Sequence, residues 1–257
     1  MDFECLRLEI DGRVAVVTLD RPKVNAQNTR LREEVIRAFD MINDMDEVRA
    51  AILTGAGKCF SAGADLSERA EIGAEPGGFW RHNRRTREAP NAIHECFKPV
   101  IAAVNGPALG AGLHIAASCD IIMASHDAVF GMPEIDVGLA GGASVLNRLF
   151  GRSRGRRMFF TGMRLSAAEM YRLGVIEEPV APDRLMPEAM AMARAIASKS
   201  PIAMKMAKEA YNVVEAMPER EAYRFEQNMT FALSKTEDAR EAQRAFIEKR
   251  EPQFKGR

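Results

Sequence analysis

Two short runs of small residues constrain the fold of this chain more than any other feature. The first is residues 60–66 (FSAGADL) and the second is residues 105–112 (NGPALGAG). Each lies where an apolar, strand-like segment gives way to a helical one, so each predicts a tight strand-to-helix corner. Such corners leave backbone N–H groups free and aimed at a common point. Two of them in one chain can form an oxyanion hole, which indicates enolate or acyl-transfer chemistry on a carbonyl group.

Composition limits the classes of partner. The chain has 257 residues, 47% of them hydrophobic, which allows one large domain, or a domain plus an extension, with a substantial core. The net charge is zero, so no overall field steers the protein to nucleic acid or to a membrane. Residues 81–87 and 152–157 are basic clusters. Solvated helix faces are the favoured interpretation of both, with contact to a phosphorylated ligand or RNA as the alternative.

Cysteine usage and the N-terminal segment indicate a cytoplasmic protein without a metal site. The four cysteines are widely spaced and form no CxxC or Cys/His set, as expected of buried, reduced thiols. The first four residues (MDFE) lack the basic and apolar regions of a signal peptide. Residues 100–124 are largely apolar, but polar residues and glycines interrupt them, so they are not expected to span a membrane.

Hydrophobic periodicity predicts an α/β core followed by helices. Strands are expected at residues 6–10, 14–19, 48–53, 99–104, 120–124 and 128–130. Helices are expected at residues 28–45 and 111–118, and at 67–97 with an interruption around 73–78 that suggests a mobile loop. Ser166 begins a capping box, and Ser200 precedes a helix-starting proline. The last sixty or so residues predict consecutive helices, whose Met-rich stripes indicate core or subunit interface.

The two corners, residues 130–134 (FGMPE) and the tail at 245–250 (AFIEKR) together resemble the crotonase superfamily, also called the enoyl-CoA hydratase/isomerase family. The resemblance covers almost the whole chain. It implies an α/β, crotonase-like spiral of ββα units over residues 1–199 and a helical C-terminal trimerisation region over residues 200–257. It also implies a homotrimer or a dimer of trimers (a homohexamer). The expected ligand is an acyl-CoA thioester, with coenzyme A as part of the substrate and no separate cofactor.

The same resemblance identifies the catalytic groups. The backbone N–H groups of Ala64 and Ala111 are expected to hold the thioester oxygen, where enolate charge develops. Glu134 matches the main catalytic carboxylate, and its apolar surroundings should raise its pKa towards neutrality. Taken alone, each corner is more simply an ordinary tight turn, and Glu134 an ordinary helix-start residue. The combination favours catalysis.

Two positions depart from the family pattern. His114 stands where two-carboxylate hydratases carry a second Glu, three residues after Ala111 and on the same helical face. Its imidazole is expected to exchange a proton with bound water, to select substrate, or to serve only in packing; these interpretations remain open. Gly142 replaces an Asp found in some isomerases of dienoyl substrates, which makes that reaction less favoured.

One firm carboxylate leaves the reaction open. Syn addition of water to a 2-enoyl thioester usually uses two groups, whereas moving a proton between the α and γ carbons needs one base. The leading expectation is a 2-enoyl-CoA hydratase of fatty acid and lipid metabolism in which His114, or water ordered by it, replaces the missing Glu. The alternatives are a Δ3,Δ2-enoyl-CoA isomerase using Glu134 alone, a hydrolase or a retro-Claisen enzyme. The non-enzyme alternative is an acyl-CoA or RNA binding protein.

Substrate contacts are carried over from the family as well. The resemblance assigns contacts with coenzyme A and its pantetheine arm to Lys23, Val24, Ala26, Ala62, Asp65 and Leu66. It places two tail residues, Phe246 and Lys249, against the coenzyme A of an adjacent subunit. An exposed turn lysine, helix capping by Asp65 and simple tail packing are the competing interpretations. Acyl-pocket walls are expected from Phe79, Trp80, Met132 and Leu139.

Overall fold

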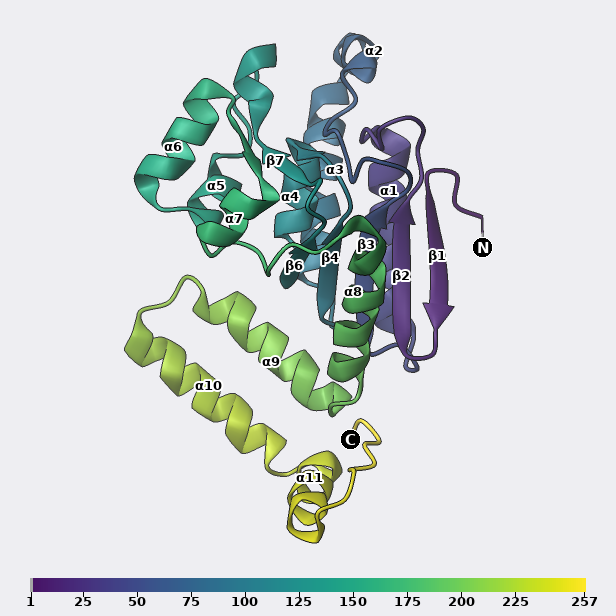
Figure 1. Cartoon of the computed structure of the whole chain (residues 1–257), viewed down its shortest axis with the longest axis vertical. Coiled ribbons are helices and arrows are strands. Elements are labelled where there is room, and N and C mark those ends of the chain that lie inside the picture. Colours follow the sequence, from purple (N-terminus) through teal and green to yellow (C-terminus); the bar gives the residue numbers. More distant parts are fainter. Residues whose placement is uncertain (1) are drawn as a thin grey trace.

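The computed structural model describes residues 2–257, in which two sheets are surrounded by helices (Figure 1). The larger sheet has the order β1-β2-β3-β4-β6. Its strands are β1 (Leu6–Asp11), β2 (Val14–Leu19), β3 (Ala50–Gly55), β4 (Val100–Val104) and β6 (Ile121–Ala124). β1 is antiparallel to β2, and the remaining neighbours are parallel. The expected strands are therefore confirmed, with shifts of a few residues at their ends.

Burial on both faces explains the continuous apolar sequence of the central strands. Every residue of β2, β3 and β4 is buried, as is usual for parallel strands covered on two sides. One face packs against α1 (Thr29–Asp44) and α3 (Gly78–His94), and the other against α8 (Pro182–Ala197). Because β2, β3 and β4 run in the same direction, their carboxyl ends meet at one edge of the sheet, where ligands usually bind.

The helices between β3 and β4 differ in detail from the expectation. A 3-10 turn, η1 (Leu66–Glu68), leads into α2 (Arg69–Ala74), and α3 follows at Gly78. Gly73 lies inside α2, so the interruption is the short turn at residues 75–77, where Gly77 has a φ of 70°. α1 begins as expected, because the side chain of Asn28 accepts a hydrogen bond from the N–H of Leu31.

A second sheet of three short strands was not predicted as such. It comprises β5 (Ala108–Leu109), β7 (Val129–Gly131) and β8 (Arg164–Ser166). Around it lie α4 (Ala111–Ala117), the 3-10 helix η2 (Pro133–Val137), α5 (Ala143–Leu149), α6 (Arg152–Thr161) and α7 (Ala167–Arg172). Ser166 caps α7 as expected, but Glu169 pairs with Arg172 and not with the cap, so the capping box is only half formed.

The C-terminal helices extend away from the sheet. They are α9 (Pro201–Val214), α10 (Glu219–Leu233) and α11 (Glu237–Glu248). Figure 1 shows α9 and α10 side by side and α11 at the end of the molecule opposite α2. Lys208 ties α9 to the core: its Nζ lies 2.8 Å from Asp120 and donates to the carbonyl oxygens of Ile93 and Lys98. Within residues 2–257, no helix combines the length and the apolar character needed to cross a membrane.

Candidate active site

The two small-residue corners lie side by side at the carboxyl edge of the larger sheet. Ser61 and Ala108 form a parallel bridge, in which the Ser61 N–H donates to Pro107 O at 3.0 Å and the Leu109 N–H to Ser61 O at 2.9 Å. A Cβ placed on Gly63 would lie 3.5 Å from the amide nitrogen of Ala111. Main-chain hydrogen bonds therefore hold residues 63 and 111 next to each other.

Backbone pairing also sets the direction of the Ala64 amide. Gln27 bonds to the residues on either side of Ala64: its N–H donates to Gly63 O at 2.7 Å, and its carbonyl accepts from Asp65 N at 3.0 Å. In such a parallel bridge the central residue points its own N–H away from its partner. The N–H of Ala64 is thus directed away from Gln27.

The Ala111 amide is left free by its place in the chain. Ala111 is the first residue of α4, and the first N–H groups of a helix have no acceptor within the helix. Among residues 2–257, neither this N–H nor that of Ala64 donates to a protein acceptor. Two neighbouring backbone donors are therefore available to a ligand, and the positive end of the short helix dipole adds to one of them.

Glu134 lies directly against the second corner. It belongs to η2, and a Cβ built on Gly110 would collide with its Oε1. Gly110 also has a φ of 55° and a ψ of −122°, a conformation that favours glycine. The missing side chain of Gly110 therefore lets the carboxyl group approach the main chain immediately before Ala111.

Burial sets the proton affinity of this carboxyl group. Desolvation raises the pKa of Glu134 from 4.5 to about 7. Its Oε2 is buried, and no group in the described part of the chain forms a hydrogen bond with it. A carboxyl group with a pKa near neutrality can both take up and release a proton at physiological pH.

His114 is electrically neutral under the same conditions. It lies on α4, half-buried, and burial followed by the charge of Arg148 lowers its pKa from 6.5 to about 4. The Arg148 guanidinium also donates to the carbonyl oxygen of Ala117 near the end of the same helix. At neutral pH the imidazole can orient water through hydrogen bonds, but it is a weaker base than Glu134.

Gly142 has a structural reason to be glycine in this chain. Its φ is 104°, and a Cβ there would lie within 3.0 Å of three atoms of the Met132 side chain. An Asp at this position would therefore need both a strained backbone and a moved Met132.

Residues 21–26, which include the expected coenzyme A contacts Lys23, Val24 and Ala26, are joined to the first corner by polar contacts. Arg21 forms an ion pair with Asp65 at 2.7 Å, and the Ala62 N–H donates to Val24 O at 2.9 Å. Asn25, at a φ of 51°, is buried and donates to the carbonyl oxygens of Ala56 and Cys59. Arg21 and Asn25 were not singled out from the sequence, because only the fold shows that the two loops touch.

Asp65 has a structural role in addition to its expected place on the pantetheine path. Its carboxylate caps η1 by accepting hydrogen bonds from the N–H and the hydroxyl of Ser67. The same carboxylate forms an ion pair with Arg21. These contacts lower its pKa, chiefly through the hydrogen bond from Ser67. The helix-capping interpretation is therefore met by the geometry.

The remaining predicted contact residues fall into two groups. Near the first corner, Lys23, Val24, Ala62 and Leu66 are exposed and Ala26 is half-buried. Phe246 and Lys249 lie at the end of α11, on the opposite side of the molecule (Figure 1). Of the expected acyl-pocket residues, Met132 is buried, Leu139 half-buried, and Phe79 and Trp80 exposed. One chain alone thus does not bring the tail residues to the corners.

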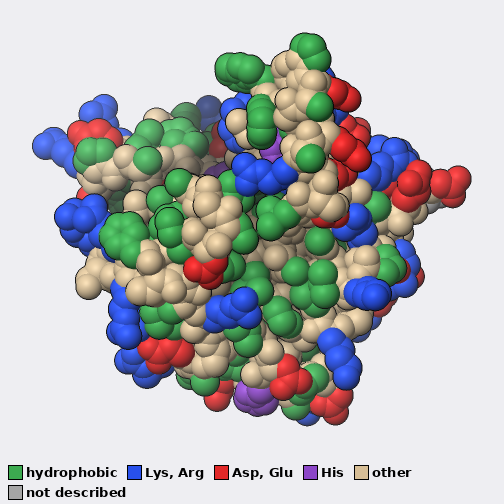
Figure 2. Space-filling view, turned by 90° about the horizontal axis from the view of Figure 1, so that it is seen from above, with side chains coloured by type: hydrophobic (Ala, Val, Ile, Leu, Met, Phe, Trp, Pro, Cys, Tyr) green, Lys and Arg blue, Asp and Glu red, His purple; other side chains and the backbone are tan. Residues whose placement is uncertain are grey.

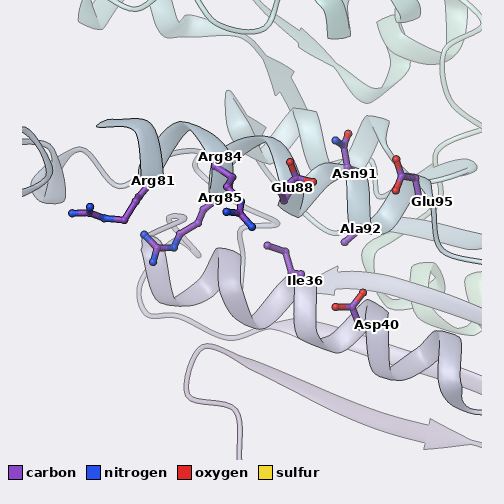
Figure 3. Close-up of a pocket in the computed structure, with 9 residues that line it drawn as sticks. All are labelled: Ile36, Asp40, Arg81, Arg84, Arg85, Glu88, Asn91, Ala92 and Glu95. Carbon is purple, nitrogen blue, oxygen red and sulfur yellow. The ribbon is translucent and has the colours of Figure 1, made fainter. Parts of the chain in front are cut away.

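The basic cluster at residues 81–87 is largely neutralised on the surface of α3. Arg81 pairs with Glu75, Arg85 with Glu33, and Arg87 with Glu88. Figure 3 shows the neighbouring pocket, of about 490 Å³, between α1 and α3. It is lined by Ile36, Asp40, Arg81, Arg84, Arg85, Glu88, Asn91, Ala92 and Glu95. None of the predicted site residues is among them, and both signs of charge line it.

The view from above in Figure 2 shows Lys and Arg interspersed with Asp and Glu around the rim of that face, with apolar side chains nearer its middle. This face carries no continuous basic patch of the kind that nucleic-acid binding requires. Because Arg81, Arg85 and Arg87 each pair with a glutamate, the solvated-face interpretation of the 81–87 cluster is the better one.

Comparison with known proteins identifies the family. The family model described as "Enoyl-CoA hydratase/isomerase" matches residues 9–257. A "Short-chain-enoyl-CoA hydratase" from Clostridium acetobutylicum is 40% identical and a "Probable enoyl-CoA hydratase" from Rhizobium meliloti is 39% identical, each over 100% of both chains. A crystal structure of an enoyl-CoA hydratase subunit from Geobacillus kaustophilus superposes with a TM-score of 0.92, at 34% identity and 100% coverage of both chains. The chain belongs to the enoyl-CoA hydratase/isomerase family and has the crotonase fold.

Proposed function

We propose that this protein is a 2-enoyl-CoA hydratase. The observation that carries the proposal is the carboxyl group of Glu134, with a pKa of about 7, packed against Gly110 beside the free N–H of Ala111. The full-length relatives named enoyl-CoA hydratase, at 39% and 40% identity, support the choice of reaction.

The chemistry follows from the positions of the groups. The N–H groups of Ala64 and Ala111 hold the thioester oxygen, where negative charge develops as water adds to the β-carbon. Fixed donors stabilise this enolate more than the ground state. Glu134 takes a proton from the attacking water and delivers one to the α-carbon, which a pKa of about 7 allows in both directions.

His114 replaces the second carboxylate in a different manner. A base with a pKa of about 4 removes a proton from water less readily than one with a pKa of about 7. We therefore assign His114 the orientation of the attacking water, with Glu134 carrying both proton transfers. The net reaction adds water and changes no oxidation state overall, so no cofactor beyond the coenzyme A of the substrate is proposed.

A Δ3,Δ2-enoyl-CoA isomerase is the second candidate, and the low pKa of His114 is the observation that favours it. Shuttling one proton between the α and γ carbons needs Glu134 alone. The purified protein should be offered a 2-enoyl-CoA and a 3-enoyl-CoA side by side. Loss of the conjugated thioester absorbance supports hydration, whereas its gain from the 3-enoyl substrate with no loss from the 2-enoyl substrate supports isomerisation and contradicts the hydratase.

The C-terminal helices support the proposal of a homotrimer or a dimer of trimers. Large hydrophobic side chains on α9, α10 and α11 are exposed in the single chain, namely Tyr211, Tyr223, Phe231, Phe246 and Ile247. Large apolar side chains exposed in this number on consecutive helices favour a protein contact. In such an assembly Phe246 and Lys249 contact the coenzyme A of a neighbour, while Lys23, Val24, Ala26, Ala62, Asp65 and Leu66 bind it within the chain. Light scattering on the purified protein tests the assembly, and a monomer contradicts it.

We further propose a cytoplasmic protein of fatty acid metabolism. The four free, buried cysteines, which are usual in a reducing compartment, and the relatives' enoyl-CoA names support this assignment. Fractionation of the source cells, with the protein followed by antibody, tests the location.

A further inference from the structure

A buried arginine beside the first corner has no protein partner for its charge. Arg32, the fourth residue of α1, is 1% exposed. In the part of the chain that the structure describes, its Nε, Nη1 and Nη2 form no hydrogen bond. A buried, unpaired guanidinium is strongly destabilising unless an opposite charge meets it. The feature therefore calls for a function.

Two further polar groups, both on α3, have buried atoms without a hydrogen-bond partner in the described part of the chain. His82 is close enough for the charge of Arg32 to lower its pKa, after burial itself, and its Nδ1 is buried without a hydrogen bond. Thr86 lies one helical turn farther along, and its Oγ1 is also buried without a partner among residues 2–257. α1 and α3 pack side by side (Figure 1). We call Arg32, His82 and Thr86 the buried polar cluster.

The neighbouring carboxylates do not neutralise the cluster. Asp65 and Glu68 are near enough to raise the pKa of Arg32, but burial outweighs them and lowers it. Asp65 is engaged by Arg21 and Ser67, and Glu68 accepts from the N–H and the hydroxyl of Thr29. Neither forms an ion pair with Arg32.

The cluster lies at the same edge of the sheet as the candidate active site. α1 follows the carboxyl end of β2, and Gln27, just before α1, pairs with the main chain at Ala64. α3 runs back towards the start of β4, so its N-terminal turns, with His82, lie at this edge too. Arg32 is only about 4.5 Å along the helix axis from the first residue of α1.

We propose that the buried polar cluster receives a carboxylate at the far end of the substrate's acyl chain. This rests on the proposed function and narrows its substrate to acyl-CoA thioesters with an anionic acyl terminus. Arg32 binds the carboxylate with its planar fork, while His82 and Thr86 donate single hydrogen bonds.

The surface above the cluster favours a carboxylate carried by the substrate over a free anion. A pocket of about 260 Å³ beside His82 is lined by three glutamates (Glu68, Glu71 and Glu75) and by two arginines (Arg81 and Arg85). Arg81 is paired with Glu75 and Arg85 with Glu33, so neither arginine is left unpaired to attract a free anion. The proposal requires an acyl chain held at the Ala64 and Ala111 amides to extend to Arg32 within the protein.

The test compares two thioesters that differ only at the acyl terminus. They are trans-2-hexenoyl-CoA and the same six-carbon thioester with a carboxylate in place of the terminal methyl group. The native protein should prefer the carboxylate by roughly tenfold to a hundredfold in kcat/KM, mainly through KM. In Arg32→Met the ratio should fall to about one, and in Thr86→Val it should fall by less.

Arg37→Met is the matched control. Arg37 lies on the same helix, is exposed and contacts the ring of Phe3, so this variant should keep the native ratio. Equal or poorer use of the carboxylate by the native protein overturns the inference, as does a preference that survives in both Arg32→Met and Thr86→Val.

Binding of the saturated analogues, hexanoyl-CoA and adipoyl-CoA, should be measured by calorimetry because it needs no turnover. Tighter adipoyl-CoA binding that depends on Arg32 supports the inference even if the hydratase assignment fails. Hydration of trans-2-hexenoyl-CoA without an adipoyl-CoA preference overturns the inference and leaves the hydratase standing.

Discussion

The carboxyl group of Glu134 packs against the α-carbon of Gly110, one residue before the free amide of Ala111. The contact joins the acid/base group to one side of the candidate oxyanion hole. It depends on a residue without a side chain, because any Cβ at position 110 meets the carboxylate. The position of the proton-transfer group therefore depends on the same short segment that positions the Ala111 amide of the candidate oxyanion hole.

Gly110→Ala should disable the enzyme while leaving a folded protein. The added methyl group displaces Glu134, and the unusual backbone at position 110 adds strain of about 1–3 kcal/mol. Steady-state hydration and thermal unfolding measure the two effects. Gly174→Ala is the control, since Gly174 has a φ of 72° with open space around it. If Gly110→Ala hydrates its substrate at the native rate, the packing of Glu134 against Gly110 is not part of the mechanism.

Glu134→Gln should lower turnover by about 10² to 10⁴-fold while thioester binding survives. In the native protein kcat/KM should rise with pH through about 7, where Glu134 ionises to act as base. The variant should lose this inflection.

The same substitution should make the protein more stable at alkaline pH. The pKa of Glu134 is raised from 4.5 to about 7, so the folded state binds more protons between these values. The contribution of Glu134 to the free energy of unfolding is therefore present at low pH and is lost as pH rises through about 7. Glu134→Gln removes the buried charge, so its Tm should exceed the native Tm at pH 8 and converge with it near pH 4. A lower Tm of the variant at pH 8 would count against the buried carboxylate.

Ala111→Pro tests a backbone donor directly. Proline is tolerated at the first position of a helix, where the N–H has no partner in the helix, but it removes that donor. We expect kcat to fall by roughly 10² to 10³-fold with a small change in Tm. Ala111→Gly keeps the N–H and should keep most activity. Equal activity of the two variants would remove the Ala111 amide from the oxyanion hole.

His114→Glu should raise hydration relative to isomerisation, since it supplies a second carboxylate. His114→Ala should lower hydration and spare isomerisation, because only the orientation of water is lost. The imidazole titration, followed by NMR, should give a pKa well below 6.5 and rise in part in Arg148→Met, since burial is the larger cause. Unchanged hydration in His114→Ala would leave His114 a packing residue.

Lys208→Met should destabilise the attachment of α9. Its removal leaves Asp120 and two carbonyl groups without their cation and costs roughly 3 kcal/mol. Urea denaturation and light scattering report the loss of stability and of assembly. Lys205 lies on the same helix as Lys208, and its ammonium group lies over the ring of Phe97. Lys205→Met should therefore cost less stability. Equal losses of stability in the two variants would show that the ion pair between Lys208 and Asp120 contributes no more than an exposed lysine does.

The sequence was sufficient for the features that depend on local patterns. Burial on both faces makes β2, β3 and β4 continuous apolar runs, and Asn28 and Ser200 cap their helices as their residue types suggest. The free amides of Ala64 and Ala111 follow from their places in corners, and the raised pKa of Glu134 follows from its apolar neighbours.

Features that depend on distant contacts were not predictable. β5 has only two residues and exists because β7 pairs with it. Arg32 interrupts an otherwise ordinary helix face, and periodicity assigns an arginine to solvent, whereas packing of α3 buries it. The carbonyl groups that accept from the Asn25 and Lys208 side chains lie more than thirty residues away along the chain, so no local pattern signals them.

The parallel bridge between Ser61 and Ala108 affects how the substrate specificity of this site can change by substitution. The separation of the two donors is fixed by peptide groups, which every residue type except proline supplies in full. Substitutions around the site can therefore alter which thioesters are accepted without rebuilding the anchor for the carbonyl oxygen. New specificities are accessible to such a scaffold one side chain at a time.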